Sequence, residues 1–109
     1  MEFVKVAETT TFSASKMMRV TAGGKEILLV NVDGACYVIA NKCTHLGGSL
    51  VGGVLNGNVV TCPRHGGSFD VKTGQAVSGA KIGILKFNIK NEVKYEVKVE
   101  GTNILIGIP

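Results

Sequence analysis

Two short segments of the chain each bring a cysteine and a histidine close together. The first runs from Cys43 to His45 and the second from Cys62 to His65, and sixteen residues separate His45 from Cys62. Together they use both histidines of the protein and two of its three cysteines. Thiolate and imidazole are side-chain ligands that suit zinc and iron. The four side chains therefore predict one metal site, and the fold must bring two separate segments together to form it.

The mixture of ligands narrows the kind of site. Plant-type and bacterial iron–sulfur clusters are held by cysteines alone. A zinc finger pairs cysteine with cysteine and histidine with histidine. Two mixed pairs fit neither pattern, although spacing alone leaves a structural zinc site open as an alternative.

The remainder of the chain is typical of a small all-β protein. Its 109 residues include 15 glycines and only 2 prolines, 45% of them are hydrophobic, and many apolar residues occur in short β-branched runs. We expect one domain over residues 1–109, with a core that needs no disulfide. Apolar runs such as Ile27–Val30 are far shorter than the ~20 residues of a membrane-spanning helix. Because the N-terminus also lacks the features of a secretory signal, we expect a cytoplasmic protein.

Alternation and turn signals predict the strands. Asp33-Gly34 predicts a type I′ hairpin turn, because both central residues of that turn need a positive φ. Regular alternation over residues 85–89 and 93–99 predicts a final hairpin with one face in the core. The only helix expected is one turn from Ser13 to Met18, capped by Ser13. The other predicted strands are Phe3–Val6, Met17–Thr21, Glu26–Val32, Cys36–Ala40, Val59–Thr61, Phe69–Val71 and Ile104–Ile108.

Glycines interrupt this regular pattern around the ligands. Gly47 and Gly48 follow the first pair, and Gly66 and Gly67 follow the second. Glycine lets backbone amides approach metal-bound sulfur closely and donate hydrogen bonds to it. The alternative explanation is that these glycines simply form turns.

The two motifs resemble those of the Rieske family, and the resemblance extends over nearly the whole chain. It implies an all-β Rieske fold of three antiparallel sheets, with a Gly-rich cluster-binding subdomain at about residues 41–75 inserted in a β base. It also implies one 2Fe-2S cluster per chain, with two cysteines on one iron and two histidines on the other. The ligands would be Cys43, His45, Cys62 and His65. The residues expected around them are Leu46, Gly47, Gly48, Pro63, Arg64, Gly66, Gly67, Ser68 and Phe69.

Departures from the high-potential branch of the family indicate which kind of Rieske protein this chain resembles. Gly48 and Arg64 stand where that branch has a disulfide, and Gly67 and Phe69 stand where it has hydroxyl donors to the cluster. Each missing donor leaves the reduced cluster less stabilised. The resemblance therefore implies a reduction potential toward the lower end of the Rieske range of about −150 to +300 mV. The neighbouring Ser68 is the alternative donor.

The resemblance to low-potential Rieske ferredoxins implies a carrier of single electrons that is not an enzyme by itself, since both histidines are used as ligands and no nucleophile or base is evident. We expect a flavoprotein reductase as donor, a terminal oxygenase or other redox enzyme as acceptor, and a monomer when free. One alternative is a small Rieske subunit of a multi-subunit reductase such as nitrite reductase. Another is a structural zinc-binding module.

The net charge and the third cysteine indicate less about function than the two Cys/His motifs do. The net charge is +4, but the lysines occur singly, often alternate with acids, and no tryptophan is present to stack on bases, so we expect no nucleic-acid binding. A modest positive charge would favour acidic redox partners. Cys36 lies on a predicted strand without a motif around it, and we expect it to pack in the core.

Overall fold

The computed structural model describes residues 2–12, 17–42, 49–63, 66–78, 80–82, 85–87 and 91–108. These residues form antiparallel strands with little helix. No helix in these ranges is long and apolar enough to cross a membrane. The elements, in chain order, are β1 (Glu2–Glu8), α1 (Thr9–Phe12), β2 (Met17–Ala22), β3 (Lys25–Val32), β4 (Ala35–Ala40), the 3-10 helix η1 (Leu50–Gly52), β5 (Val54–Asn56), β6 (Val59–Thr61), β7 (Ser68–Asp70), β8 (Ala76–Ser78), β9 (Ala80–Ile82), β10 (Leu85–Phe87), β11 (Val97–Glu100) and β12 (Asn103–Ile108).

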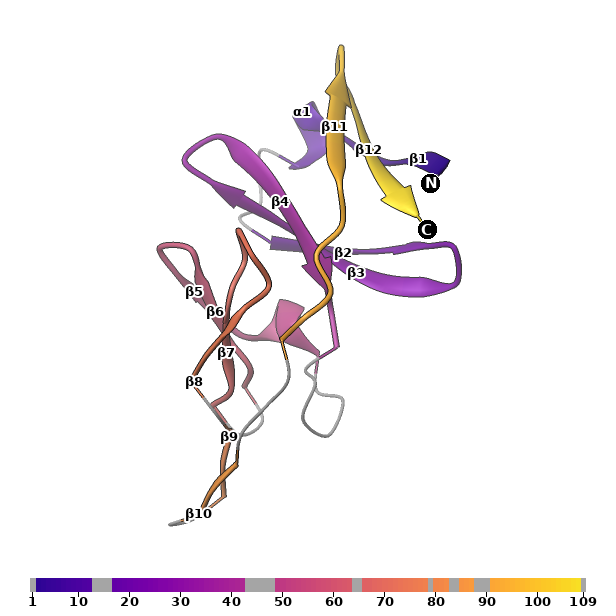
Figure 1. Cartoon of the computed structure of the whole chain (residues 1–109). Helices are drawn as coiled ribbons and strands as arrows, with labels where there is room; N and C mark the ends of the chain where they lie inside the picture. The colour runs from indigo at the N-terminus through magenta and orange to yellow at the C-terminus, as the bar shows by residue number, and fades with distance from the viewer. Residues whose placement is uncertain are drawn as a thin grey trace.

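The described strands form three sheets and one two-stranded ribbon (Figure 1). The sheets have the strand orders β1-β12-β11, β2-β3-β4 and β5-β6-β7-β8, and the ribbon pairs β10 with β9. Every strand pairing is antiparallel. The predicted all-β fold with three antiparallel sheets is therefore confirmed, and the ribbon adds to it.

Strand β3 contains the apolar run Ile27–Val30. Its residues Ile27, Leu28, Leu29 and Val30 are all fully buried. Successive side chains of a strand point to opposite faces, so Leu28 and Val30 enter one core while Ile27 and Leu29 enter another. The β2-β3-β4 sheet is thus the middle layer of the molecule, covered on both faces.

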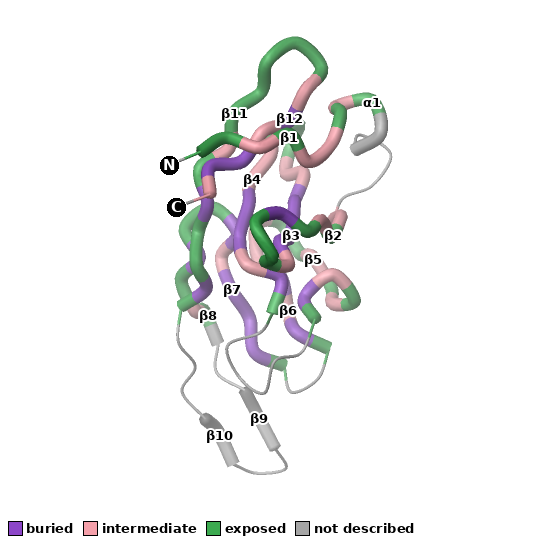
Figure 2. Tube along the Cα trace, turned by 90° about the vertical axis from the view of Figure 1, so that its right-hand side faces the viewer, coloured by how far each residue is buried: buried purple, intermediate pink, exposed green. Residues whose placement is uncertain are grey.

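The two cores have separate memberships. The cluster-side core lies between the middle sheet and the β5–β8 sheet, and it contains Leu28, Val30, Ile39, Leu50, Val60, Cys62, Phe69 and Val71. The base core lies between the middle sheet and the β1-β12-β11 sheet, and it contains Ala22, Ile27, Leu29, Val38, Tyr95, Ile104 and Ile106. Figure 2 shows the buried stretches along β4 and β7. Each fully buried Leu, Ile or Phe contributes roughly 1.5–3 kcal/mol to folding, so both cores help to hold the middle sheet in place.

The hairpin turn predicted between β3 and β4 is confirmed. Asp33 has a φ of 52° and Gly34 a φ of 85°, which is the positive pair that a type I′ turn requires. The side chain of Asn31 adds a bond, since its Oδ1 accepts from the Gly34 N–H at 3.0 Å.

The hairpin predicted between residues 85–89 and 93–99 is wrong. β10 pairs with the preceding β9, and β11 pairs with the following β12. Residues 93–95 instead pair with the backbone of β4 in the middle sheet: the Val93 carbonyl accepts from the Ala40 N–H at 2.9 Å, and the Tyr95 N–H donates to the Val38 carbonyl at 3.0 Å. The alternation was real, but it did not reveal which strand each segment would pair with.

Burial on this segment also differs from the prediction. Tyr95 is buried as expected, whereas Val93 and Val99 are 57% and 52% exposed. Only part of the face of residues 93–99 that was expected to be buried is therefore buried.

The predicted helical turn from Ser13 to Met18 is also not found where it was expected. The short helix α1 lies earlier, at Thr9–Phe12, and Met17 and Met18 begin strand β2. Residues 13–16 lie outside the described residues. Met18 packs against the base core, so tertiary packing favours the strand over a local turn.

Candidate metal centre

Of the four predicted ligands, Cys62 lies in the part of the chain that the structure describes. Cys43, His45 and His65 lie outside the described residues, as do Leu46, Gly47, Gly48 and Arg64. The site can therefore be built from Cys62 and from the described residues that flank both ligand segments.

Cys62 directly follows strand β6 and belongs to the cluster-side core, where it is 2% exposed. Two backbone hydrogen bonds close the loop that it begins. The Cys62 N–H donates to the Gly67 carbonyl at 2.7 Å, and the Gly66 N–H donates to the Cys62 carbonyl at 3.2 Å. Gly66 has a φ of 78°, a conformation that glycine adopts at little cost. The backbone position of this ligand is therefore set by the loop itself.

The loop reaches the surface immediately after Cys62. Pro63 is exposed and so is Gly66, whereas Gly67, Ser68 and Phe69 are buried again. Phe69 packs in the same core as Cys62, so its ring excludes water from the protein side of this region. Both ends of the 64–65 segment thus lie at the molecular surface.

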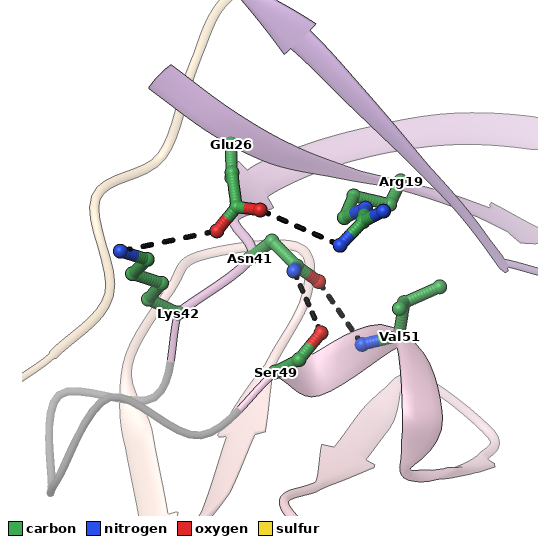
Figure 3. A network of polar contacts seen from close by, with 6 residues as sticks. All are labelled: Arg19, Glu26, Asn41, Lys42, Ser49 and Val51. Carbon is green, nitrogen blue, oxygen red and sulfur yellow. Dashed lines mark hydrogen bonds and ion pairs between the residues drawn. The ribbon is translucent and has the colours of Figure 1, made fainter. Parts of the chain in front are cut away.

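The other ligand segment is held at its two ends. Lys42 precedes it and Ser49 follows it, and these two residues form an isolated antiparallel bridge. One residue farther out, the Leu50 N–H donates to the Asn41 carbonyl at 2.7 Å. Asn41 is fully buried, and its side chain also bonds across this gap (Figure 3). The chain before residue 43 is therefore paired directly with the chain after residue 48.

The two ligand segments are attached to one packed unit. Leu50, which follows the first segment, shares the cluster-side core with Cys62. Farther along, Gly53 lies so close to the Thr61 carbonyl that a Cβ on it would overlap that oxygen, while a Cβ on Gly52 would lie 4.0 Å from Pro63. The chain after the first segment is therefore packed against the chain before and within the second.

Comparison with known proteins identifies this arrangement. The sequence model of the Rieske [2Fe-2S] domain matches residues 2–86. The chain belongs to the Rieske family. It is 38% identical over 92 residues to the ferredoxin component of a naphthalene 1,2-dioxygenase system of Pseudomonas aeruginosa, which covers 84% of this chain and 82% of the relative.

Solved structures of Rieske ferredoxins agree with this assignment. The ferredoxin of carbazole 1,9a-dioxygenase from Nocardioides aromaticivorans IC177 superposes with a TM-score of 0.82 at 29% identity, covering 97% of both chains. A chain from a complex of reduced oxygenase and oxidized ferredoxin in carbazole 1,9a-dioxygenase superposes with a TM-score of 0.78 at 28% identity, covering 95% of this chain and 91% of that one. A Rieske 2Fe-2S cluster is therefore the cofactor of this chain.

The described residues fit such a cluster. Cys62 offers a thiolate ligand on a loop whose backbone is fixed by hydrogen bonds, and neither Gly66 nor Gly67 has a side chain that would occupy the space beside it. In a Rieske centre two thiolates balance the charge of the oxidised core, because the histidine ligands are neutral. The oxidised cluster therefore requires no buried counter-ion from the protein.

Charged side chains near the first segment interact at the surface (Figure 3). Glu26 lies 3.4 Å from Arg19 and 3.9 Å from Lys42, and all three side chains are at least a third exposed. Exposed ion pairs of this kind contribute about 0–1 kcal/mol. They orient Lys42 more than they stabilise the Rieske fold.

Cys36 packs against the base core, as predicted. Burial raises the pKa of its thiol to about 11. The thiol therefore stays protonated near neutral pH and is a poor nucleophile or metal ligand.

Two residues of this Rieske chain have a structural importance that the sequence did not reveal. No sequence motif or spacing marked Asn41 or Glu92 as important. Glu92 is 7% exposed, its Oε2 has no hydrogen-bond partner among the residues that the structure describes, and burial raises the pKa of its carboxyl to about 7. The pKa of Tyr95 is raised by burial and then by the charge of Glu92. No local pattern distinguishes either residue, because their surroundings come from distant segments.

Proposed function

We propose that this chain is a Rieske ferredoxin that carries single electrons from a flavoprotein reductase to a terminal oxygenase. In this proposal Cys43 and Cys62 hold one iron of the cluster, and His45 and His65 hold the other. The observation that carries the proposal is the likeness to ferredoxin components of dioxygenase systems, which extends over 97% of both chains for the ferredoxin of carbazole 1,9a-dioxygenase and over more than four-fifths of both chains for that of naphthalene 1,2-dioxygenase. It is not an enzyme by itself: the bound cluster supplies the one-electron chemistry, and the protein supplies its position and surroundings.

The structure around Cys62 supports a carrier role. The cysteine is anchored in the core, while the loop that follows it is at the surface on both sides of residues 64–65. Such a layout would keep the cysteine side of the cluster dry and leave the histidine side near a docking partner. A fixed backbone also limits the rearrangement that accompanies electron transfer.

The surroundings of the proposed cluster support a potential toward the lower end of the Rieske range. Gly67 has no hydroxyl to offer a sulfur, and Phe69 contributes an apolar ring to the core next to Cys62. Reduction adds one negative charge to the cluster, and a dry apolar environment stabilises that charge poorly. A low potential suits transfer from a flavin to an oxygenase.

The names of the related ferredoxins suggest the class of protein that accepts the electron. Their names place them in dioxygenase systems for naphthalene and carbazole, and one related ferredoxin is seen in a complex with its oxygenase. We propose a terminal oxygenase of an aromatic compound as the acceptor here. We further propose that residues 1–109 act as one domain, with residues of about 41–75 as its cluster-binding subdomain, in the cytoplasm and as a monomer when free.

The cofactor assignment is tested on the purified protein. Iron and sulfide should be present in equal amounts, and dithionite reduction should produce the EPR signal of a Rieske cluster. Zinc without a reduced-state signal would refute the assignment and favour the structural zinc module.

The carrier role needs a second experiment. Stopped-flow mixing should show reduction of the protein by NAD(P)H and a flavoprotein reductase, followed by reoxidation by an oxygenase, and gel filtration should show a free red protein. Isolation only as a stable complex with a catalytic reductase subunit would contradict the shuttle and favour the alternative of a nitrite reductase subunit.

A further inference from the structure

Asn41 makes four hydrogen bonds in a position where it is fully buried. Its side-chain Nδ2 donates to the Ser49 Oγ at 2.9 Å, and its Oδ1 accepts from the Val51 N–H at 3.0 Å (Figure 3). Its backbone N–H donates to the Glu26 carbonyl at 3.1 Å, and its carbonyl accepts from the Leu50 N–H at 2.7 Å. A buried amide with both ends bonded is far more costly to replace than an exposed one, because an apolar substitute leaves its partners unpaired.

Three of these bonds, those to Ser49, Leu50 and Val51, cross the ends of the first ligand segment. Asn41 stands two residues before Cys43, and its partners Ser49, Leu50 and Val51 are the first residues described after the segment. The bridge between Lys42 and Ser49 lies just inside them. We call residues 41, 42 and 49–51 the neck. The neck brings the two ends of a six-residue segment together and holds them in one register.

The neck is also connected to the structure that holds Cys62. The bond from Asn41 to Glu26 attaches the neck to β3 in the middle sheet, and Leu50 is fully buried in the cluster-side core, which also contains Cys62. A shift of the neck would therefore move the first segment relative to the second. A cluster held by residues of both segments would be sensitive to such a displacement, because the groups that support metal ligands fix their orientation.

We propose that Asn41 is a positioning residue, whose side-chain amide holds the neck so that Cys43 and His45 meet the cluster in register with Cys62 and His65. The proposal rests on the proposed ligand set. Asn41 acts through the ligand segment and does not itself touch the cluster. Loss of its amide should loosen the hold on the cluster more than it loosens the fold.

The test compares three variants of the cluster-loaded protein. Asn41→Leu removes the amide with little change in size, and Ser49→Ala removes one of its partners at an exposed position. The matched control is Asn31→Ala, because Asn31 also bonds a backbone amide, that of Gly34, at the opposite end of the β3–β4 hairpin. Each protein is measured for its thermal midpoint, its EPR g-values after dithionite reduction, and its rate of bleaching by an iron chelator.

We expect Asn41→Leu to lose its cluster about ten-fold or more faster than Asn31→Ala, a larger difference than the thermal midpoints of the two variants account for, as is found when residues that support metal ligands are replaced. Its g-values should shift, and Ser49→Ala should show a smaller change in the same direction. Bleaching rates that follow the thermal midpoints alone, with unchanged g-values, would overturn the proposal.

If Asn41→Leu yields no folded protein, Ser49→Ala decides the question, and bleaching at the wild-type rate refutes the positioning role. Wild-type protein that contains zinc and gives no reduced-state signal refutes the ligand set itself. The two failures are therefore distinguishable.

Discussion

The buried carboxyl of Glu92 makes the stability of this ferredoxin depend on pH. The Glu92 N–H donates to the Gly74 carbonyl at 2.7 Å, and next to it the Asn91 Oδ1 accepts from the Ala76 N–H at 2.8 Å. Residues 91–95 therefore connect the end of the β5–β8 sheet to the middle sheet. Within the described part of the chain, one oxygen of this carboxyl has no hydrogen-bond partner, and burial makes ionisation of the carboxyl in the folded protein unfavourable.

The direction of the effect follows from the two pKa values of Glu92. The carboxyl titrates near 4.5 in the unfolded chain, and burial raises its pKa to about 7 in the folded protein. Between these values the folded state binds more protons than the unfolded state, so a rise in pH favours unfolding. The stability that the protonated carboxyl allows is fully present below about pH 4.5 and is lost as the pH rises through about 7.

The size of the effect has a ceiling of about 3 kcal/mol, since each pKa unit corresponds to 1.36 kcal/mol and the shift runs from 4.5 to about 7. Relaxation of the protein and water penetration around a buried charge remove part of this cost. We therefore expect about 1–2 kcal/mol, which corresponds to roughly 5–10 °C in the thermal midpoint of a domain of this length.

The assay compares the wild-type holoprotein with Glu92→Gln from pH 4.5 to 8 at a single scan rate. The glutamine keeps the shape of the side chain and cannot ionise, and titration of the histidines and of the cluster cancels in the difference. We expect the wild-type midpoint to fall by 5–10 °C relative to the variant across this range. Glu96→Gln is the control, because Glu96 is exposed and its removal should give a constant difference. A constant difference for Glu92→Gln as well would refute the reasoning.

Three further outcomes are expected. His65→Cys should retain a cluster but lower its reduction potential, because a thiolate ligand adds negative charge; a potential at or above the wild-type value, measured by redox titration, would count against His65 as a ligand. The wild-type potential should be flat near neutral pH and fall at alkaline pH as the ligand imidazoles lose protons, and no change up to about pH 11 would contradict exposed histidine ligands. Gly53→Ala should lower stability by about 1–3 kcal/mol, because its Cβ would overlap the Thr61 carbonyl; the control Gly52→Ala makes only an ordinary contact with Pro63, and equal thermal midpoints for the two would disprove the steric argument.

The parts of the fold that could be predicted are those that depend on near neighbours. The Asp33-Gly34 turn depends on the φ preferences of two adjacent residues, and both have the positive φ expected. The run Ile27–Val30 marked an apolar strand, but only the structure showed that both of its faces are covered. Local chemistry thus predicts elements better than it predicts what they pack against.

The wrong hairpin has the same cause. Alternation in residues 93–99 was compatible with pairing to either neighbour along the chain. The actual partner of β11 is β12, which also pairs with β1 and carries the fully buried Ile104 and Ile106. Pairing β11 with the buried strand β12 is more favourable than pairing it with the preceding segment in a local hairpin. The sequence of residues 93–99 alone does not show which strand is its partner.

The metal site likewise has a part that could be predicted from the sequence and a part that could not. The ligands were predicted from residue type and spacing, since a metal needs particular side chains wherever the fold places them. The neck could not be predicted, because Asn41 gains its importance only when Ser49 and Val51 are brought beside it.

The two ligand segments are held by different chemistry, and this difference has a consequence for how each tolerates substitution. The loop after Cys62 is closed by backbone groups of Cys62, Gly66 and Gly67, so changing an exposed side chain such as Pro63 leaves those bonds in place. The neck of the first segment depends in addition on the side chains of Asn41 and Ser49. Side-chain substitution can therefore break the neck while the backbone pairing of the second loop survives. Because each loop contributes one ligand to each iron in the proposed site, a loosened neck would weaken the hold on both irons at once.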